Sequence, residues 1–104
     1  MLRLEGYAVL VAHDSEAGLR EVKTSRPDAI LLDLRMPLVD GLAFLRRLRG
    51  HDEGQSRTPV AIITGDYFLD DTFSRELREL DAALYFKPLW TEDLVRVVRR
   101  LLGK

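Results

Sequence analysis

The residues that could do chemistry are an acid, a hydroxyl and an amine, each directly after a short apolar run. They are Asp33, Thr64 and Lys87. Such a trio suits a phosphoryl group, because a carboxylate can accept it, a hydroxyl can donate a hydrogen bond to it and an ammonium can balance its charge. Taken singly, each residue has an ordinary structural role, such as a turn, a helix cap or a solvated side chain. The functional interpretation therefore depends on finding all three together.

The elements that must position this trio can be predicted from the spacing of apolar residues. Four continuous apolar runs predict strands buried on both faces: Tyr7–Ala12, Ala29–Leu32, Val60–Ile63 and Ala83–Phe86. Segments with helical spacing alternate with them, at about Asp14–Ser25, Asp40–Leu48, Leu69–Leu80 and Thr91–Leu102. This alternation predicts an α/β fold with a parallel sheet and right-handed crossovers. Because the carboxyl ends of parallel strands share one edge, the trio should gather there.

Composition narrows the class of protein. The 104 residues carry 16 basic and 17 acidic side chains, a formal net charge of −1. This balance argues against a general nucleic-acid or membrane-surface binder, and we expect neither partner. The chain has no Cys, which excludes disulfides, a thiolate nucleophile and a zinc–sulfur site. We expect one domain over residues 1–104, and a cytoplasmic location because no signal-peptide pattern opens the sequence.

Several segments together resemble the receiver domain of two-component response regulators. They are Leu31-Leu-Asp-Leu-Arg-Met-Pro37, Asp40-Gly41, Ile62-Ile-Thr-Gly65 and Phe86-Lys-Pro88. The Asp-x-x-Met-Pro-x-x-Asp-Gly block is the most specific part, and the similarity covers essentially the whole chain. It implies a flavodoxin-like (receiver-type) doubly wound parallel sheet, which the family builds from five strands in the order 2-1-3-4-5. We expect four of these strands and four helices, because the sequence is N-terminally truncated relative to the family.

The resemblance also implies roles for individual residues. Asp33 matches the phosphoacceptor, Thr64 the hydroxyl that follows the phosphoryl group, and Lys87 the invariant lysine, whose bond to Pro88 is cis in the family. Asp33 and the backbone carbonyl of Arg35 match ligands of Mg²⁺, the cofactor that the family uses. The partner implied is a histidine kinase or another signalling protein.

The sequence departs from the family pattern at its start. Met1–Gly6 resembles the end of the family's first helix, so the preceding strand, with its adjacent acidic pair for Mg²⁺, has no counterpart here. Whether this truncation is natural, or the sequence is a piece of a longer receiver, stays open. Since Mg²⁺ usually needs more than one carboxylate, we expect its binding to be weak or absent. Asp33 and Lys87 should then form a simple ion pair, and phosphorylation should be impaired.

The missing strand leaves the central position of the sheet vacant. If Tyr7–Ala12 moves beside Ala29–Leu32, right-handed crossovers place the first three helices on one face and Thr91–Leu102 on the other. That other face should then expose apolar strand surface, which favours self-association as a homodimer.

The same move would bring His13 and Asp14 beside Asp33, where Asp14 could serve as a further metal ligand. The alternative is that Asp14 caps the following helix, and its spacing favours this second interpretation.

Three further residues concern a switch and partner surface. The family usually has an aromatic switch residue three positions before the lysine, where this chain has Leu84, followed by Tyr85. Trp90 either packs on the last helix or contributes to a partner surface. Six arginines are expected to line solvated helix faces rather than bind nucleic acid: Arg46, Arg47, Arg49, Arg96, Arg99 and Arg100.

These observations leave three classes of function. One is a receiver-like module that is impaired in phosphorylation, is not an enzyme and acts through protein contacts. Another is a conventional stand-alone switch that accepts phosphate from a histidine kinase on Asp33. The third, a phosphatase that uses a phosphorylated aspartate, requires a second Asp two residues after the nucleophile, where this chain has Arg35. We therefore set the third class aside and favour the first.

Overall fold

A five-stranded, mostly parallel sheet forms the centre of the protein. The computed structural model describes residues 2–34, 38–50, 57–65 and 71–103. The parallel strands lie side by side in chain order: β2 (Tyr7–Ala12), β3 (Ala29–Leu34), β4 (Val60–Thr64) and β5 (Ala82–Phe86). They correspond to the four apolar runs of the sequence, so the predicted α/β fold class is confirmed.

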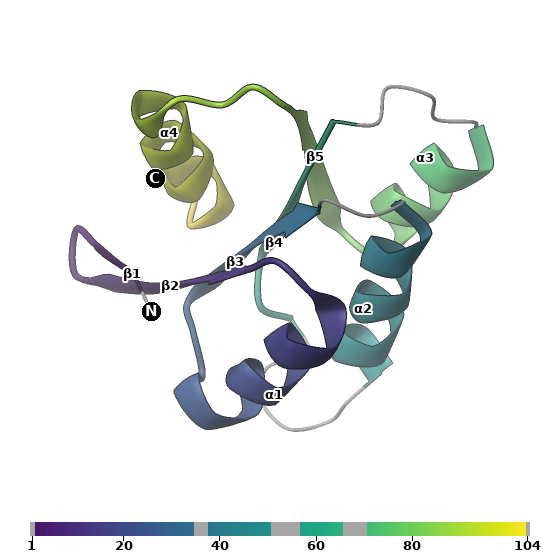
Figure 1. Ribbon diagram of the computed structural model, residues 1–104, viewed down its shortest axis with the longest axis horizontal. Coiled ribbons are helices and arrows are strands. Elements are labelled where there is room, and N and C mark those ends of the chain that lie inside the picture. The colour runs from purple at the N-terminus through teal and green to yellow at the C-terminus, as the bar shows by residue number, and fades with distance from the viewer. Residues whose placement is uncertain (1, 35–37, 51–56, 66–70, 104) are drawn as a thin grey trace.

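Three of the helices connect consecutive parallel strands by crossovers, and the fourth follows the last strand. They are α1 (Ser15–Ser25), α2 (Leu38–Gly50), α3 (Asp71–Glu79) and α4 (Thr91–Leu101). Figure 1 shows α1, α2 and α3 on one side of the sheet and α4 on the other. This is the arrangement expected if Tyr7–Ala12 lies beside Ala29–Leu32, and those two strands are indeed paired in parallel.

The N-terminal segment differs from the expected helix end. Leu2–Leu4 forms a short strand, β1, which pairs antiparallel with β2. Glu5 and Gly6 make a two-residue turn, with φ angles of 51° and 87°. Positive φ at both turn residues suits the twist of a tight hairpin. The sheet therefore has five strands in chain order, rather than four.

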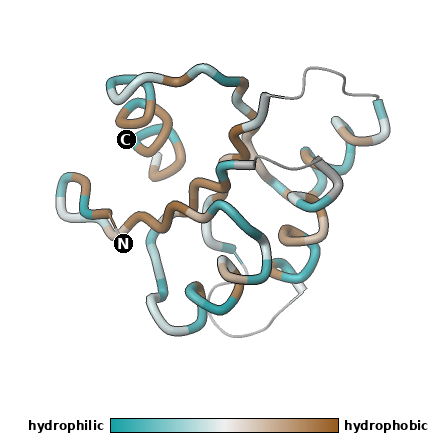
Figure 2. Tube along the Cα trace, viewed as in Figure 1, coloured by the Kyte–Doolittle hydropathy of each residue, from teal (hydrophilic) through white to brown (hydrophobic). Residues whose placement is uncertain are grey.

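Two apolar clusters fill the space on either side of the sheet, and the strands that they share form a continuous hydrophobic band in Figure 2. The larger cluster joins the sheet to α1, α2 and α3 around the fully buried Phe44. In the smaller cluster, Val97 and Val98 of α4 cover the other face. The strand residues beneath α4 are Val9, Leu31, Ala61 and Ile63, all buried.

The expected exposure of apolar strand surface on the α4 face is confined to the β1–β2 edge, where Leu2 and Val11 are exposed, because α4 covers Val9, Leu31, Ala61 and Ile63. Among the described residues, the large apolar side chains that remain exposed are Leu2, Val11, Phe86 and Trp90.

Within the described ranges, no helix has the length and apolar character that crossing a membrane requires.

Candidate functional site

The carboxyl edge of the parallel strands brings Asp33 and Lys87 together, as the sequence predicts. Asp33 is the second-last residue of β3, and Lys87 directly follows β5. The Lys87 Nζ atom lies 2.7 Å from the Oδ1 atom of Asp33, an ion pair between side chains that are 35% and 27% exposed. Oδ1 is itself buried, and no well-directed hydrogen bond reaches it from the described residues. The contact between Lys87 and Asp33 is therefore mainly electrostatic.

His13 approaches the other oxygen of the same carboxylate. The register pairs Ala12, the last residue of β2, with Leu32 of β3, and the residues that follow these two along the chain are His13 and Asp33. The Nδ1 atom of His13 lies 3.6 Å from Oδ2 of Asp33. The carboxylate therefore has a lysine on one oxygen and an imidazole facing the other.

Thr64 completes the trio at the end of β4, the strand between β3 and β5. Its side chain is buried. The backbone N–H of Lys87 donates to the carbonyl of Thr64 at 2.9 Å, which ties the start of the segment after β5 to β4. The Lys87–Pro88 bond is cis, as the resemblance implied. These contacts fix where the lysine leaves the sheet.

Of the two other proposed metal ligands, the structure describes only Asp14, which caps a helix. The carboxylate of Asp14 accepts hydrogen bonds from the backbone N–H groups of Glu16 and Ala17, at 2.8 and 3.3 Å. Asp14 is thus the N-cap of α1, which is the interpretation that its spacing favoured. Arg35 lies outside the described residues.

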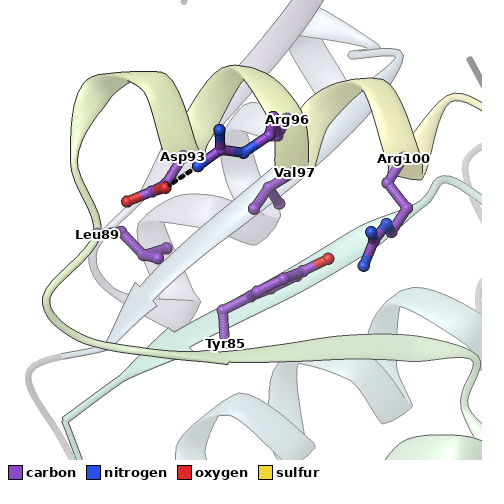
Figure 3. Close-up of a pocket in the computed structure, with 6 residues that line it drawn as sticks. All are labelled: Tyr85, Leu89, Asp93, Arg96, Val97 and Arg100. Carbon is purple, nitrogen blue, oxygen red and sulfur yellow. Dashed lines mark hydrogen bonds and ion pairs between the residues drawn. The ribbon is translucent and has the colours of Figure 1, made fainter.

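The three residues of the expected switch and partner surface point in different directions. Leu84 packs with the cluster beneath α1–α3, whereas Tyr85 packs with the α4 cluster on the opposite face. Tyr85 also lines a groove beside α4, with Leu89 and Val97 (Figure 3). Trp90, at the start of α4, is 68% exposed. It is therefore available on the surface rather than buried against the last helix.

The arginines of α2 were expected on a solvated face, and this is wrong for Arg49. Its half-buried guanidinium donates to the carbonyls of Leu80, Thr58 and Asp81, at 2.8, 2.6 and 3.1 Å. Desolvation by burial lowers the pKa of Arg49. No periodicity in the sequence points to this role, because the three acceptors are backbone carbonyls outside the helix, in the segments before β4 and β5.

Two neighbouring arginines pair with other helices. Arg46 pairs with Glu76 of α3, and Arg47 with Glu16 of α1. The hydrogen bond between Arg46 and Glu76 lowers the pKa of Glu76 and raises that of Arg46. The sequence carries one signal for these contacts: arginines on one predicted helix and glutamates on the helices before and after it.

A model of the response regulator receiver domain matches residues 1–99. The chain belongs to this family. It is therefore a receiver domain of two-component signalling, a class of module that works with a histidine kinase or another signalling partner.

Relatives support this assignment over nearly the whole chain. Response regulator MprA of Mycobacterium tuberculosis is 36% identical over 106 residues, which cover 99% of this chain and 43% of the relative. Transcriptional regulatory protein PrrA of Mycobacterium leprae is 36% identical over 103 residues, with coverages of 99% and 42%. The chain thus spans about two-fifths of the length of these curated relatives.

Solved structures agree on the fold. The solution structure of a response regulator protein from Burkholderia multivorans is 33% identical, with a TM-score of 0.61, and the match covers 92% of this chain and 75% of that one. A chemotaxis protein of Vibrio cholerae is 20% identical, with a TM-score of 0.73 and coverages of 92% and 99%. The second likeness shows the fold alone.

Receiver domains typically bind Mg²⁺ at the phosphorylation site, and the described residues fit that ion poorly. Mg²⁺ requires near-octahedral oxygen ligands and usually one or two carboxylates. Here Asp33 is a single carboxylate, with an ammonium on one oxygen and an imidazole nitrogen beside the other. In the part of the chain that the structure describes, no three His, Asp or Glu side chains gather to hold a metal.

Proposed function

We propose that residues 1–104 act as one cytoplasmic receiver-like domain that is impaired in Mg²⁺-dependent phosphorylation, is not an enzyme and signals through protein contacts. The observation that carries this proposal is the surroundings of Asp33, whose two oxygens face Lys87 and His13. A phosphoryl donor that approaches a carboxylate without a bridging metal meets repulsion between like charges. Lys87 offsets part of this repulsion, but one ammonium supplies less charge than a divalent ion.

The alternative is a conventional switch, which the residue types of Asp33, Thr64 and Lys87 favour. In that case Asp33 takes a phosphoryl group from a histidine kinase, Lys87 balances its charge and the Thr64 hydroxyl hydrogen-bonds to it. The positions of Asp33 and Lys87 at one edge of the sheet support this alternative. The poor fit to Mg²⁺ is the observation that places it second.

Intact mass after incubation with acetyl phosphate and Mg²⁺ separates the two. We expect little or no phosphoryl adduct on protein that circular dichroism shows to be folded. A full adduct that Asp33→Asn abolishes would instead establish the conventional switch.

The variant His13→Asp tests the reason for the impaired phosphorylation. It places a second carboxylate beside Asp33 on the neighbouring strand, and so supplies the kind of ligand that Mg²⁺ prefers. We expect it to increase the Mg²⁺-dependent adduct. An unchanged adduct would mean that the lack of carboxylates is not what limits phosphorylation.

We also propose that the domain contacts partners through Tyr85 and the exposed Trp90, and that it self-associates as a homodimer. Leu2 pairs with Val9 across the β1–β2 hairpin, so both lie on the α4 face of the sheet, and Val11 shares that face two residues further along. Leu2 and Val11 are 42% and 39% exposed. These two side chains support self-association at the β1–β2 edge.

A further inference from the structure

We propose that His13 and Asp33 form a binding site for a divalent transition-metal ion that favours nitrogen ligands, such as Co²⁺, Ni²⁺ or Zn²⁺. This inference concerns the same carboxylate as the proposed function and goes beyond it, because it assigns that carboxylate a different ion and a second ligand. It follows from the place of β2 in the sheet, which puts an imidazole beside Asp33.

The distance between the two side chains suits a shared ion. Nδ1 of His13 and Oδ2 of Asp33 lie 3.6 Å apart, too far for a direct hydrogen bond. Two ligand atoms that are each about 2.0–2.1 Å from a tetrahedral ion lie about 3.4 Å from one another. A small rotation of either side chain therefore brings both atoms into the coordination sphere of one ion.

The two oxygens of the Asp33 carboxylate have different neighbours. Lys87 pairs with the buried Oδ1, while Oδ2 faces His13. The side chain of His13 is 56% exposed and that of Asp33 is 27% exposed, so a hydrated ion can reach both. Water would fill the remaining coordination positions of the ion, since within the described ranges no third His, Asp or Glu side chain joins these two ligands. Two protein ligands and a nearby ammonium imply moderate affinity.

The chemistry of the two ligands decides which ion is preferred. Imidazole nitrogen binds Co²⁺, Ni²⁺ and Zn²⁺ much better than Mg²⁺, which favours oxygen ligands and holds its waters tightly. An imidazole and a single carboxylate therefore select against Mg²⁺. The same feature that weakens the usual receiver cofactor creates a site for another class of ion.

The test is a titration of the folded protein with Co²⁺, followed by amide resonances in two-dimensional NMR. A paramagnetic ion broadens nearby signals, so we expect the first losses at residues 12–14, 32–33 and 87. We also expect about a tenfold excess of Mg²⁺ to leave this pattern in place, because Mg²⁺ does not compete for imidazole. Broadening centred elsewhere, or its reversal by Mg²⁺, would overturn the inference.

Substitutions at the two histidines make the test specific. His13→Gln should weaken Co²⁺ affinity by roughly tenfold or more, because the nitrogen ligand is lost. His51→Gln changes the chain's other histidine and should leave affinity unchanged. Equal Co²⁺ affinity in His13→Gln and in the parent protein would contradict the proposal. The NMR spectrum of each variant shows whether it is folded.

Lys87→Met provides an independent check on the charges. Removing the ammonium beside Asp33 should strengthen Co²⁺ binding several-fold, because a positive charge near the ion is lost. Weaker binding in this variant would contradict the arrangement. Phosphorylation is measured separately by mass, so a failure of Co²⁺ binding and a failure of the proposed function give different results.

Discussion

Asp33 illustrates how neighbours define what a carboxylate can do. It lies near the carboxyl end of a parallel strand, where the proposed phosphoacceptor would be, and Lys87 lies 2.7 Å away. His13 faces its second oxygen, where the sequence of a typical receiver leads one to expect acidic ligands. The proposed change of ion therefore depends on one side chain, which directly follows an adjacent strand.

Arg49 provides a prediction at the scale of one residue. Its guanidinium joins the end of α2 to three backbone carbonyls in the segments before β4 and β5. Arg49→Ala should lower the free energy of unfolding by about 2 kcal/mol, because three backbone carbonyls, two of them in part-buried contacts, lose a charged donor. Urea denaturation measures this loss.

Arg47→Ala is the matched control for Arg49→Ala. Arg47 lies on the same helix, and its ion pair with Glu16 is exposed on both sides. We expect a change within about 0.5 kcal/mol, since exposed ion pairs contribute little to stability. Equal losses in the two variants would show that Arg49 does not have the structural role assigned to it.

At the scale of elements, the start of α4 depends on the carboxylate of Asp93. The backbone N–H of Trp90 donates to Asp93 at 2.9 Å, and Arg96 pairs with its other oxygen. The hydrogen bond from Trp90, and then the contacts with Arg96, lower the pKa of Asp93 below its ordinary value of 3.8. A carboxylate thus satisfies a backbone donor that a helix N-terminus leaves open.

This depressed pKa predicts a pH dependence with a definite sign. The unfolded chain binds the proton more readily, so the contribution of Asp93 to stability is present above pH 3.8 and is lost as the pH falls through the depressed pKa. Asp93→Asn should therefore be less stable than the parent at neutral pH, with the difference shrinking in acid. Urea unfolding across a pH series measures the difference.

Glu92→Gln changes a neighbouring acid in the same helical turn. It removes the favourable placement of a negative charge near the helix N-terminus but no hydrogen bond to Trp90, so its effect should be smaller. A difference between Asp93→Asn and the parent that stays constant from neutral pH into acid would contradict the role of the carboxylate charge.

At the scale of the whole molecule, the order of strands decides how the faces are covered. Because β2 to β5 follow one another along the sheet, all three crossover helices lie on one side (Figure 1). Within the described structure, α4 alone covers the other side, and it leaves Leu2 and Val11 exposed at the β1–β2 edge. This edge is where the proposed homodimer would form.

The oligomeric state tests that proposal directly. Sedimentation equilibrium over a dilution series should show a dimer that dissociates as the protein is diluted. Val11→Lys should shift the equilibrium toward monomer, because it places a charge in the apolar contact. Lys23→Glu, an exposed charge change on α1, serves as the control and should have little effect. A parent protein that stays monomeric at every concentration would refute the homodimer.

Much of the fold could be predicted because its signals are local. Continuous apolar runs and helical spacing of leucine and valine determined the four parallel strands and the alternation with helices. The role of Asp14 as a helix cap could also be predicted, because a cap accepts hydrogen bonds from residues only two and three positions further along the chain. The trio of Asp33, Thr64 and Lys87 followed from the rule that parallel strands end at one edge.

Only the tertiary structure decided which residues that are distant in the sequence become neighbours. Whether Tyr7–Ala12 lies beside β3 depends on long-range packing, because an apolar strand fits more than one position in a buried sheet. That choice brings His13 to Asp33 and turns Leu2–Leu4 into a hairpin strand. The carbonyls held by Arg49 are likewise set by folding. Local patterns therefore determined the elements and the place of Asp33 near the end of a strand, and packing determined what surrounds it.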